Sequence, residues 1–353
     1  MNIFDYVKKY GNLSFEEKEF NEVDNLVFCS LLYLNYSKTS VCKKEVTLEV
    51  AGKQYLKRNF FTDIKRLGIP HKMGYKLLEL AITTKRYKDI IVHDYVYKKN
   101  DDKQFCAMMF RINNNLEYIC YEGTDEWISG WKEDMELSCL FPVPAQVDAI
   151  NYANKHIKIF GPNIILGGHS KGGNLALIAA MYTKPLKQFR IQQIYNNDGP
   201  GLRNREFTSK EYNHIKPKYI HIIPNSSMVG ILLRNDIYTV IKSTTNNILS
   251  HAVLTWVIDD DKFERSERTE RSIKIENNVI SWLDNHTDEE RYIMVKEVFD
   301  ALEQANIHKT RELGNITKFV HVIKNMKNID KQTKDLLIEL IKYYFESFRK
   351  EKE

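Results

Sequence analysis

The sequence contains few cysteines, glycines and prolines, and it has no long apolar run. Its five cysteines form no CxxC pair and leave one over, which argues against a disulfide framework and predicts a reducing compartment. With 15 Gly and 8 Pro the chain is neither collagen-like nor a Pro-rich linker. No stretch reaches the ~18 uninterrupted apolar residues of a membrane span. Charges interrupt residues 1–9, where a signal peptide would be apolar. We therefore expect a soluble cytoplasmic protein without an integral membrane segment.

The chain also has little net charge and lacks the common motifs for metals and nucleotides. The chain has 52 Lys and Arg against 47 Asp and Glu, a net charge of +5, and it lacks the basic and aromatic interleaving that single-stranded nucleic acid requires. No HExxH motif is present, and no P-loop or GxGxxG follows a predicted strand. We expect no nucleic-acid partner, no metal and no cofactor.

The chain does have the composition of a globular protein, with 43% apolar and 28% charged residues. Its periodicity divides it into three parts. These are a mostly helical N-terminal segment (1–100), an α/β core (101–262) and a helical C-terminal extension (263–353).

In the first part, helical spacing predicts helices at residues 20–36 and 72–83, while 43–55 is ambiguous between strand and helix. The expected helices of the last part are 275–283, 288–305, 310–326 and 331–348. The last part is either a helical cap packed on the core or a module that binds a protein partner, whose identity the sequence does not reveal.

Strands alternate with helices in the middle part. Runs at 105–112 and 116–121 predict a hairpin around Asn113, Asn114 and Asn115. The strands expected after it are 164–166, 191–195, 219–223 and 238–241, and the helices between them are 145–156, 174–182 and 209–215. This alternation predicts an α/β unit with a largely parallel sheet.

The segment with the clearest chemistry is Gly168-x-Ser170-x-Gly172, between a predicted strand and a predicted helix. This is the nucleophile-elbow pattern, in which a serine occupies a strained turn and side chains two residues away would collide with the backbone. The alternative is a tight turn that only packs. At a helix N-terminus, the Lys171 backbone N–H would stabilise an oxyanion. A second donor is expected in the loop Glu122-Gly123-Thr124-Asp125, which could also be a simple turn.

These motifs resemble those of an uncharacterised bacterial lipase-like α/β-hydrolase family, distantly related to the fungal-type (class 3) triacylglycerol lipases. The resemblance covers residues 20–282 and is strongest over 121–201. The matching motifs are FNEVD (20–24), YEGTD (121–125), GWKED (130–134), GHSKGGN (168–174), NNDGPG (196–201) and SMVG (227–230). It implies an α/β-hydrolase fold with a central, mostly parallel sheet, with Ser170 as nucleophile and Thr124 in the oxyanion loop.

One position departs from the family pattern. Relatives usually carry Arg before the Gly-Thr pair, matched with the acidic residue that ends the Trp-containing motif, whereas this chain has Glu122 there and Asp134 in the acidic position. Two carboxylates would repel unless one is protonated or a nearby lysine compensates.

In this fold the triad follows the chain order Ser, Asp or Glu, then His. Among the histidines after the elbow, His251 lies in a loop that follows a predicted strand, and the family resemblance agrees with it; the alternative is a capping histidine. The acid is less certain, because the loop after strand 219–223 has no carboxylate. Asp198, at a strand end, is favoured over Asp236 since a strand holds an orienting carboxylate rigidly.

The sequence thus predicts a serine hydrolase that cleaves an ester or thioester, lipid-like or small. The alternative is a non-catalytic protein with the same fold that binds a ligand or partner in its cleft. The apolar run 228–233 follows a strand end, so Met228, Val229, Leu232 and Leu233 are predicted to line an acyl-binding wall or lid. A buried core segment is the competing interpretation.

Overall fold

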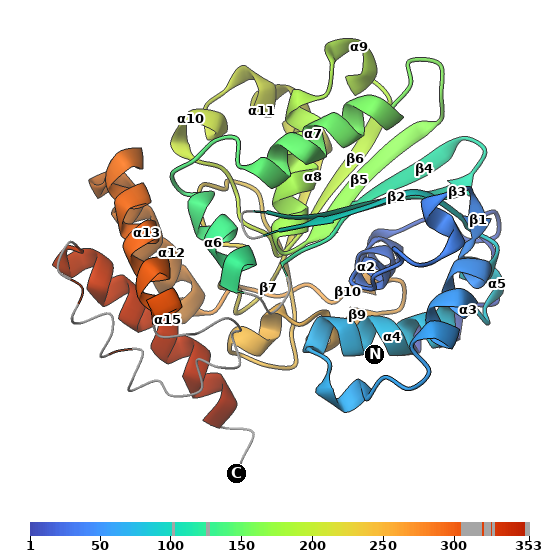
Figure 1. Ribbon diagram of the computed structural model, residues 1–353, viewed down its shortest axis with the longest axis horizontal. Coiled ribbons are helices and arrows are strands. Elements are labelled where there is room, and N and C mark those ends of the chain that lie inside the picture. The colour runs from blue at the N-terminus through green and yellow to red at the C-terminus, as the bar shows by residue number, and fades with distance from the viewer. Residues whose placement is uncertain (101–102, 125–127, 305–319, 321–325, 327–328, 350–353) are drawn as a thin grey trace.

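The computed structural model describes the chain except residues 101–102, 125–127, 305–319, 321–325, 327–328 and 350–353 (Figure 1). Its centre is an eight-stranded sheet in which the strands lie side by side in chain order. Pairing is antiparallel from β1 to β4 and parallel from β4 to β8. The strands are β1 (Val46–Thr47), β2 (Ile91–Lys99), β3 (Gln104–Asn113), β4 (Leu116–Tyr121), β5 (Asn163–His169), β6 (Ile191–Asn197), β7 (Tyr219–Pro224) and β8 (Thr239–Ile241). This is the predicted α/β-hydrolase fold, with a central sheet that is mostly parallel.

Helices cover both faces of the sheet, as the blue and green ribbons of Figure 1 show. One face carries α1 (Ile3–Tyr10), α2 (Glu22–Leu32), α3 (Leu48–Arg58), α4 (Ile69–Ala81) and α5 (Lys85–Lys88). The other carries α7 (Pro144–His156), α8 (Lys171–Tyr182) and α11 (Lys210–Ile215). Alternate side chains of β3 serve the two layers: Met108 and Phe110 pack with the first group, and Ala107 and Met109 with the second.

The sheet begins earlier in the chain than the sequence analysis predicts. β1 and β2 both precede residue 101, where the α/β core was expected to start, and β2 pairs along most of its length with β3. The ambiguous stretch 43–55 contains both elements, since β1 is followed at once by α3. The strand ends at Thr47 and the helix begins at the next residue. The Thr47 side chain accepts a hydrogen bond from the Val50 N–H (3.2 Å) and caps α3.

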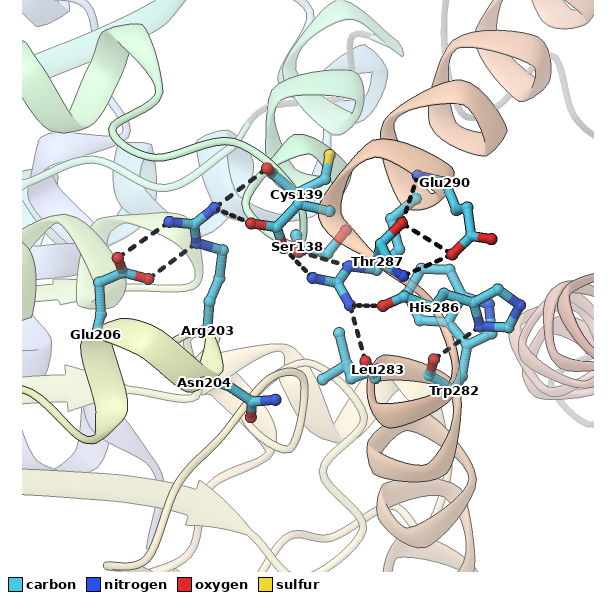
Figure 2. Close-up of polar contacts among 12 residues, drawn as sticks. Ser138, Cys139, Arg203, Asn204, Glu206, Trp282, Leu283, His286, Thr287 and Glu290 are labelled. Atoms are coloured by element: carbon cyan, nitrogen blue, oxygen red, sulfur yellow. Dashed lines mark hydrogen bonds and ion pairs between the residues drawn. The ribbon is translucent and has the colours of Figure 1, made fainter.

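The C-terminal helices α12 (Glu270–Asn285), α13 (Asp288–Gln304) and α15 (Lys331–Arg349) pack beside the core. Most of the helix predicted at 310–326 lies outside the described residues. Arg291 of α13 donates to the carbonyls of Ser138 and Leu283 (2.8 Å each), and Arg203 pairs with Asp288. Figure 2 shows Arg203 beside the Cys139 carbonyl, to which it donates (3.1 Å). These contacts favour the cap interpretation of the tail.

Two smaller features complete the fold. A two-stranded ribbon joins β9 (Ile258–Asp259) and β10 (Lys262–Phe263). Within the described residues, no helix combines the length and apolar character needed to cross a bilayer.

Candidate active site

Ser170 lies between the last residue of β5 and the first residue of α8, with φ 59° and ψ −136°. This left-handed backbone is strained for a residue with a side chain and is the expected geometry of a nucleophile elbow. A Cβ at Gly168 would lie 2.2 Å from the Gly172 carbonyl carbon, and one at Gly172 would lie 2.2 Å from the Tyr121 oxygen. The two glycines are therefore required by the close packing of the turn.

Asp198 follows β6 and its carboxylate is fully buried. One oxygen accepts the Gly230 N–H (3.0 Å) and the Ser227 hydroxyl, and the other contacts His251 Nδ1 (2.7 Å). A carboxylate can only accept, so Nδ1 donates this bond, and Nε2 is the atom that could accept a proton from a substrate-attacking group. A Cβ at residue 230 would lie 2.4 Å from Asp198, so glycine there allows the backbone to donate to the carboxylate.

The alternative acid, Asp236, has other partners. It accepts a hydrogen bond from the Tyr212 hydroxyl (2.7 Å) and pairs with Lys216. Of the two acids that the sequence leaves open, the structure brings Asp198 to His251.

His169, the residue before Ser170, also lies beside the site. Its ring stacks on that of His251, with 4.5 Å between centroids. Its Nε2 lies 2.9 Å from the His251 carbonyl, which can only accept, so Nε2 is the protonated nitrogen and Nδ1 accepts from the Tyr33 hydroxyl (2.8 Å). Burial, and then the charge of His251, lower the pKa of His169 well below its usual value. The His169 imidazole that stacks on His251 therefore stays neutral.

The loop at Gly123 and Thr124 lies directly beside the elbow. A Cβ on Gly123 would be 3.0 Å from Ser170 Cβ. The Thr124 hydroxyl donates to both Asp134 oxygens (2.8 and 2.7 Å), which ties the loop to α6 (Ile128–Glu136). The two residues predicted to supply oxyanion donors, Thr124 and Lys171, thus flank the serine.

The Lys171 side chain is fully buried, which the sequence analysis missed. Its Nζ contacts Glu133 at 2.8 Å and Asp134 at 3.8 Å. Burial works to lower the Lys171 pKa, but Asp134, Glu133 and then Glu122 outweigh it and raise the pKa, so the side chain stays charged. Lys171 is therefore the cation that compensates the neighbouring carboxylates, Glu133 and Asp134 by contact and Glu122 through its charge.

Replacing this cation should destabilise the protein in a pH-dependent way. Lys171→Met leaves buried carboxylates without a counter-ion, and we expect the free energy of unfolding to fall by about 3 kcal/mol at neutral pH. Burial already raises the pKa of Asp134 to about 6, with Lys171 opposing the shift, so the variant should raise it further. A raised carboxyl pKa means that the folded state binds more protons than the unfolded state, so stability decreases as pH rises.

Urea unfolding at pH 5 and pH 8 measures this effect. The loss should be clearly larger at pH 8, while Lys132→Met, which removes a more exposed lysine of α6, should cost less than about 1 kcal/mol at either pH. An equal loss at both pH values would show that Lys171 only fills space.

The predicted acyl-binding residues divide into two groups. Met228 and Leu233 are buried in the cluster that joins the core to the C-terminal helices, whereas Val229 and Leu232 are half-buried. The first pair has a packing role in addition to any contact with substrate. Among the described residues, no group of three or more His, Cys, Asp or Glu side chains could hold a metal ion.

Comparison with known proteins places the chain in a family. The sequence model of the Mbeg1-like family matches residues 81–300. A fungal lipase–inhibitor complex, titled as a model for interfacial activation in lipases, is 12% identical with a TM-score of 0.35, over 48% of this chain and 70% of that one. The M37 lipase is 15% identical with a TM-score of 0.36, over 60% and 70%. No curated protein matches the chain.

Proposed function

This chain belongs to the Mbeg1-like family, and we propose that it is a serine hydrolase that cleaves a carboxylic ester or thioester of a lipid-like or small molecule. The observation that supports this most strongly is the 2.7 Å contact between His251 Nδ1 and the buried Asp198 carboxylate. In serine hydrolases a buried carboxylate orients the imidazole and stabilises the imidazolium that forms during the reaction. A protein that only binds a ligand has no need of such a pair. Ser170, with the backbone geometry of a nucleophile elbow, follows β5, the strand that pairs with β6 before Asp198.

In the proposed mechanism, Ser170 Oγ attacks the carbonyl carbon while His251 Nε2 accepts its proton. Asp198 holds the required tautomer of His251 and stabilises the imidazolium. Backbone N–H groups of Thr124 and Lys171 stabilise the oxyanion, and the N-terminus of α8 adds its positive dipole. His251 then protonates the leaving alcohol or thiol, and water hydrolyses the acyl-serine by the same steps in reverse.

A fluorophosphonate probe tests the proposal, because only an activated serine reacts with it. The wild-type protein should be labelled at Ser170, and esters of graded chain length would then define the acyl preference. The competing function is a non-catalytic protein that binds a ligand or partner in the same cleft. Absence of labelling in a folded wild-type protein would favour it.

The run after β7 is proposed to contact the acyl chain of the substrate through its half-buried residues. Leu232→Asp should reduce turnover of long-chain esters more than that of acetate esters, since each buried methylene contributes ~0.8 kcal/mol. Measured kcat/KM against chain length should therefore flatten in the variant. Leu13→Asp, which makes the same change at an exposed leucine near the N-terminus, is the matched control. Equal losses for short and long esters would assign Leu232 to the core.

We also propose a reducing, cytoplasmic location. All five cysteines are free thiols, and four of them are buried. Whether the C-terminal helices also bind a protein partner is a separate question, which pull-down with the intact chain addresses.

A further inference from the structure

An apolar and strongly basic surface lies where β5 and β6 begin, at the end of these strands away from Ser170. Three apolar side chains are exposed there: Phe160 at 96%, Leu186 at 73% and Phe189 at 53%. Five cations accompany them. We call this the basic edge; its members are Phe160, Leu186, Phe189, Lys155, Lys158, Lys184, Lys187 and Arg190.

Printed contacts join the two segments that form the basic edge. Arg190 Nε donates to the Ile159 carbonyl (2.8 Å), and the Lys184 N–H donates to the Asn154 side chain (2.8 Å). Lys187 Nζ donates to the carbonyl of the same Asn154. In Figure 1, α9 (Pro185–Gln188) accordingly lies at the top of the molecule, near the loop that follows α7. The apolar and basic side chains therefore form one surface.

The charge of the basic edge is not compensated from within its own part of the chain. Residues 149–197 contain no Asp or Glu. The hydrogen bonds of Lys158, Lys187 and Arg190 go to backbone carbonyls, whereas exposed lysines elsewhere, such as Lys85, pair with carboxylates. Burial and then the neighbouring Lys158 and Lys184 lower the pKa of Lys187, which shows that the cations repel one another. An external polyanion would relieve this repulsion.

We propose that the basic edge binds the surface of an anionic lipid bilayer. Leu186 and Phe160 are exposed apolar tips surrounded by lysines, the arrangement that lets apolar groups enter the headgroup region while long cationic side chains contact lipid phosphates. A nucleic acid would use the cations but not a projecting leucine, which cannot stack on a base. An acidic protein surface would leave Phe160 in water.

Bilayer binding at this edge leaves the catalytic centre accessible. β5 has seven residues between the basic edge and Ser170, which at ~3.3 Å per residue is about 23 Å. The opening over Ser170 would face away from the lipid surface. The inference does not depend on the proposed hydrolase function, and Ser170→Ala protein can be used throughout so that no lipid is consumed.

Sedimentation with vesicles tests the proposal. Full-length Ser170→Ala protein should bind vesicles of phosphatidylglycerol and phosphatidylcholine, bind pure phosphatidylcholine far more weakly, and lose affinity as salt increases. Lys155→Glu/Lys158→Glu/Lys184→Glu should weaken binding by at least ~100-fold. Phe160→Ser/Leu186→Ser, which keeps every charge, should weaken it by about 10-fold.

Two matched variants separate the basic edge from other causes. Lys8→Glu/Lys43→Glu/Lys44→Glu changes the net charge equally at exposed lysines elsewhere and should retain most of the affinity. Phe60→Ser/Phe61→Ser removes two adjacent aromatic side chains outside the basic edge, which are 75% and 95% exposed, and should have little effect on vesicle binding. Thermal unfolding confirms that each variant is folded.

Three results would overturn the proposal. The first is that the parent protein does not bind anionic vesicles. The second is that the Lys8, Lys43 and Lys44 control loses as much vesicle affinity as the basic-edge lysine variant. The third is that the Phe60 and Phe61 variant loses affinity while the Phe160 and Leu186 variant does not. Binding to a single-stranded oligonucleotide in place of vesicles counts as the first of these.

Discussion

Ser170→Ala should lower ester turnover by at least ~10³-fold and abolish fluorophosphonate labelling, while the protein remains folded. The loss is large because nucleophile, base and acid act as a unit, and removing the attacking oxygen disables all three. The fold should persist because alanine can occupy the same strained backbone as serine and no hydrogen bond of the Ser170 side chain holds α8 in place. Steady-state kinetics, labelling and thermal unfolding measure the three parts of the expectation.

Ser30→Ala is the matched control for this substitution. Ser30 is another buried serine, and its hydroxyl donates to the Leu26 carbonyl within α2. Its loss should leave turnover within about twofold, since the hydroxyl bonds to a carbonyl of its own helix. Unchanged turnover in Ser170→Ala would remove Ser170 as the nucleophile and leave the binding-protein alternative.

Asp198→Asn should reduce kcat by about 10⁴-fold. The carboxylate accepts three hydrogen bonds, and an amide can keep only the two from Ser227 and Gly230 with its oxygen. Its NH2 group would then face His251 Nδ1 and convert that nitrogen into an acceptor. Nε2 would carry the proton, and the imidazole could no longer take the proton of Ser170.

Asp236→Asn is the corresponding control, because it makes the same chemical change in the acid that the sequence also allowed. Its side chain holds Tyr212 and Lys216, so we expect a small loss of stability and nearly normal kcat. The reverse pattern, with kcat unchanged in Asp198→Asn and strongly reduced in Asp236→Asn, would assign the acid to Asp236.

The sequence predicts the elbow well because its determinants are local. The contact that requires Gly168 is with Gly172, four residues on, and the spacing of the two around Ser170 identifies the turn, although the contact that requires Gly172 is with Tyr121 at the end of the distant strand β4. The hairpin β3–β4 and the helices α7 and α8 are predicted for the same reason. Their alternation and apolar stripes lie within a single short window.

The features that could not be predicted depend on distant partners. The choice between Asp198 and Asp236 rests on Ser227, Gly230 and His251, which lie 29 to 53 residues beyond Asp198. Lys171 resembles a surface lysine until Glu133, 38 residues away, is folded against it. β2 is different, because its β-branched and aromatic residues, Ile91, Val92 and 95–97, were a strand signal within a single short window.

The chain-order arrangement of the strands has a consequence for biosynthesis. Each strand from β2 to β8 pairs with the one made immediately before it, so a nascent chain can extend the sheet from one edge without opening any earlier pair. Ser170 and Asp198 leave the ribosome with the growing sheet, but His251 follows β8. A partly translated chain therefore completes its sheet before it acquires His251, so the proposed nucleophile has no proposed base until after β8 has been made.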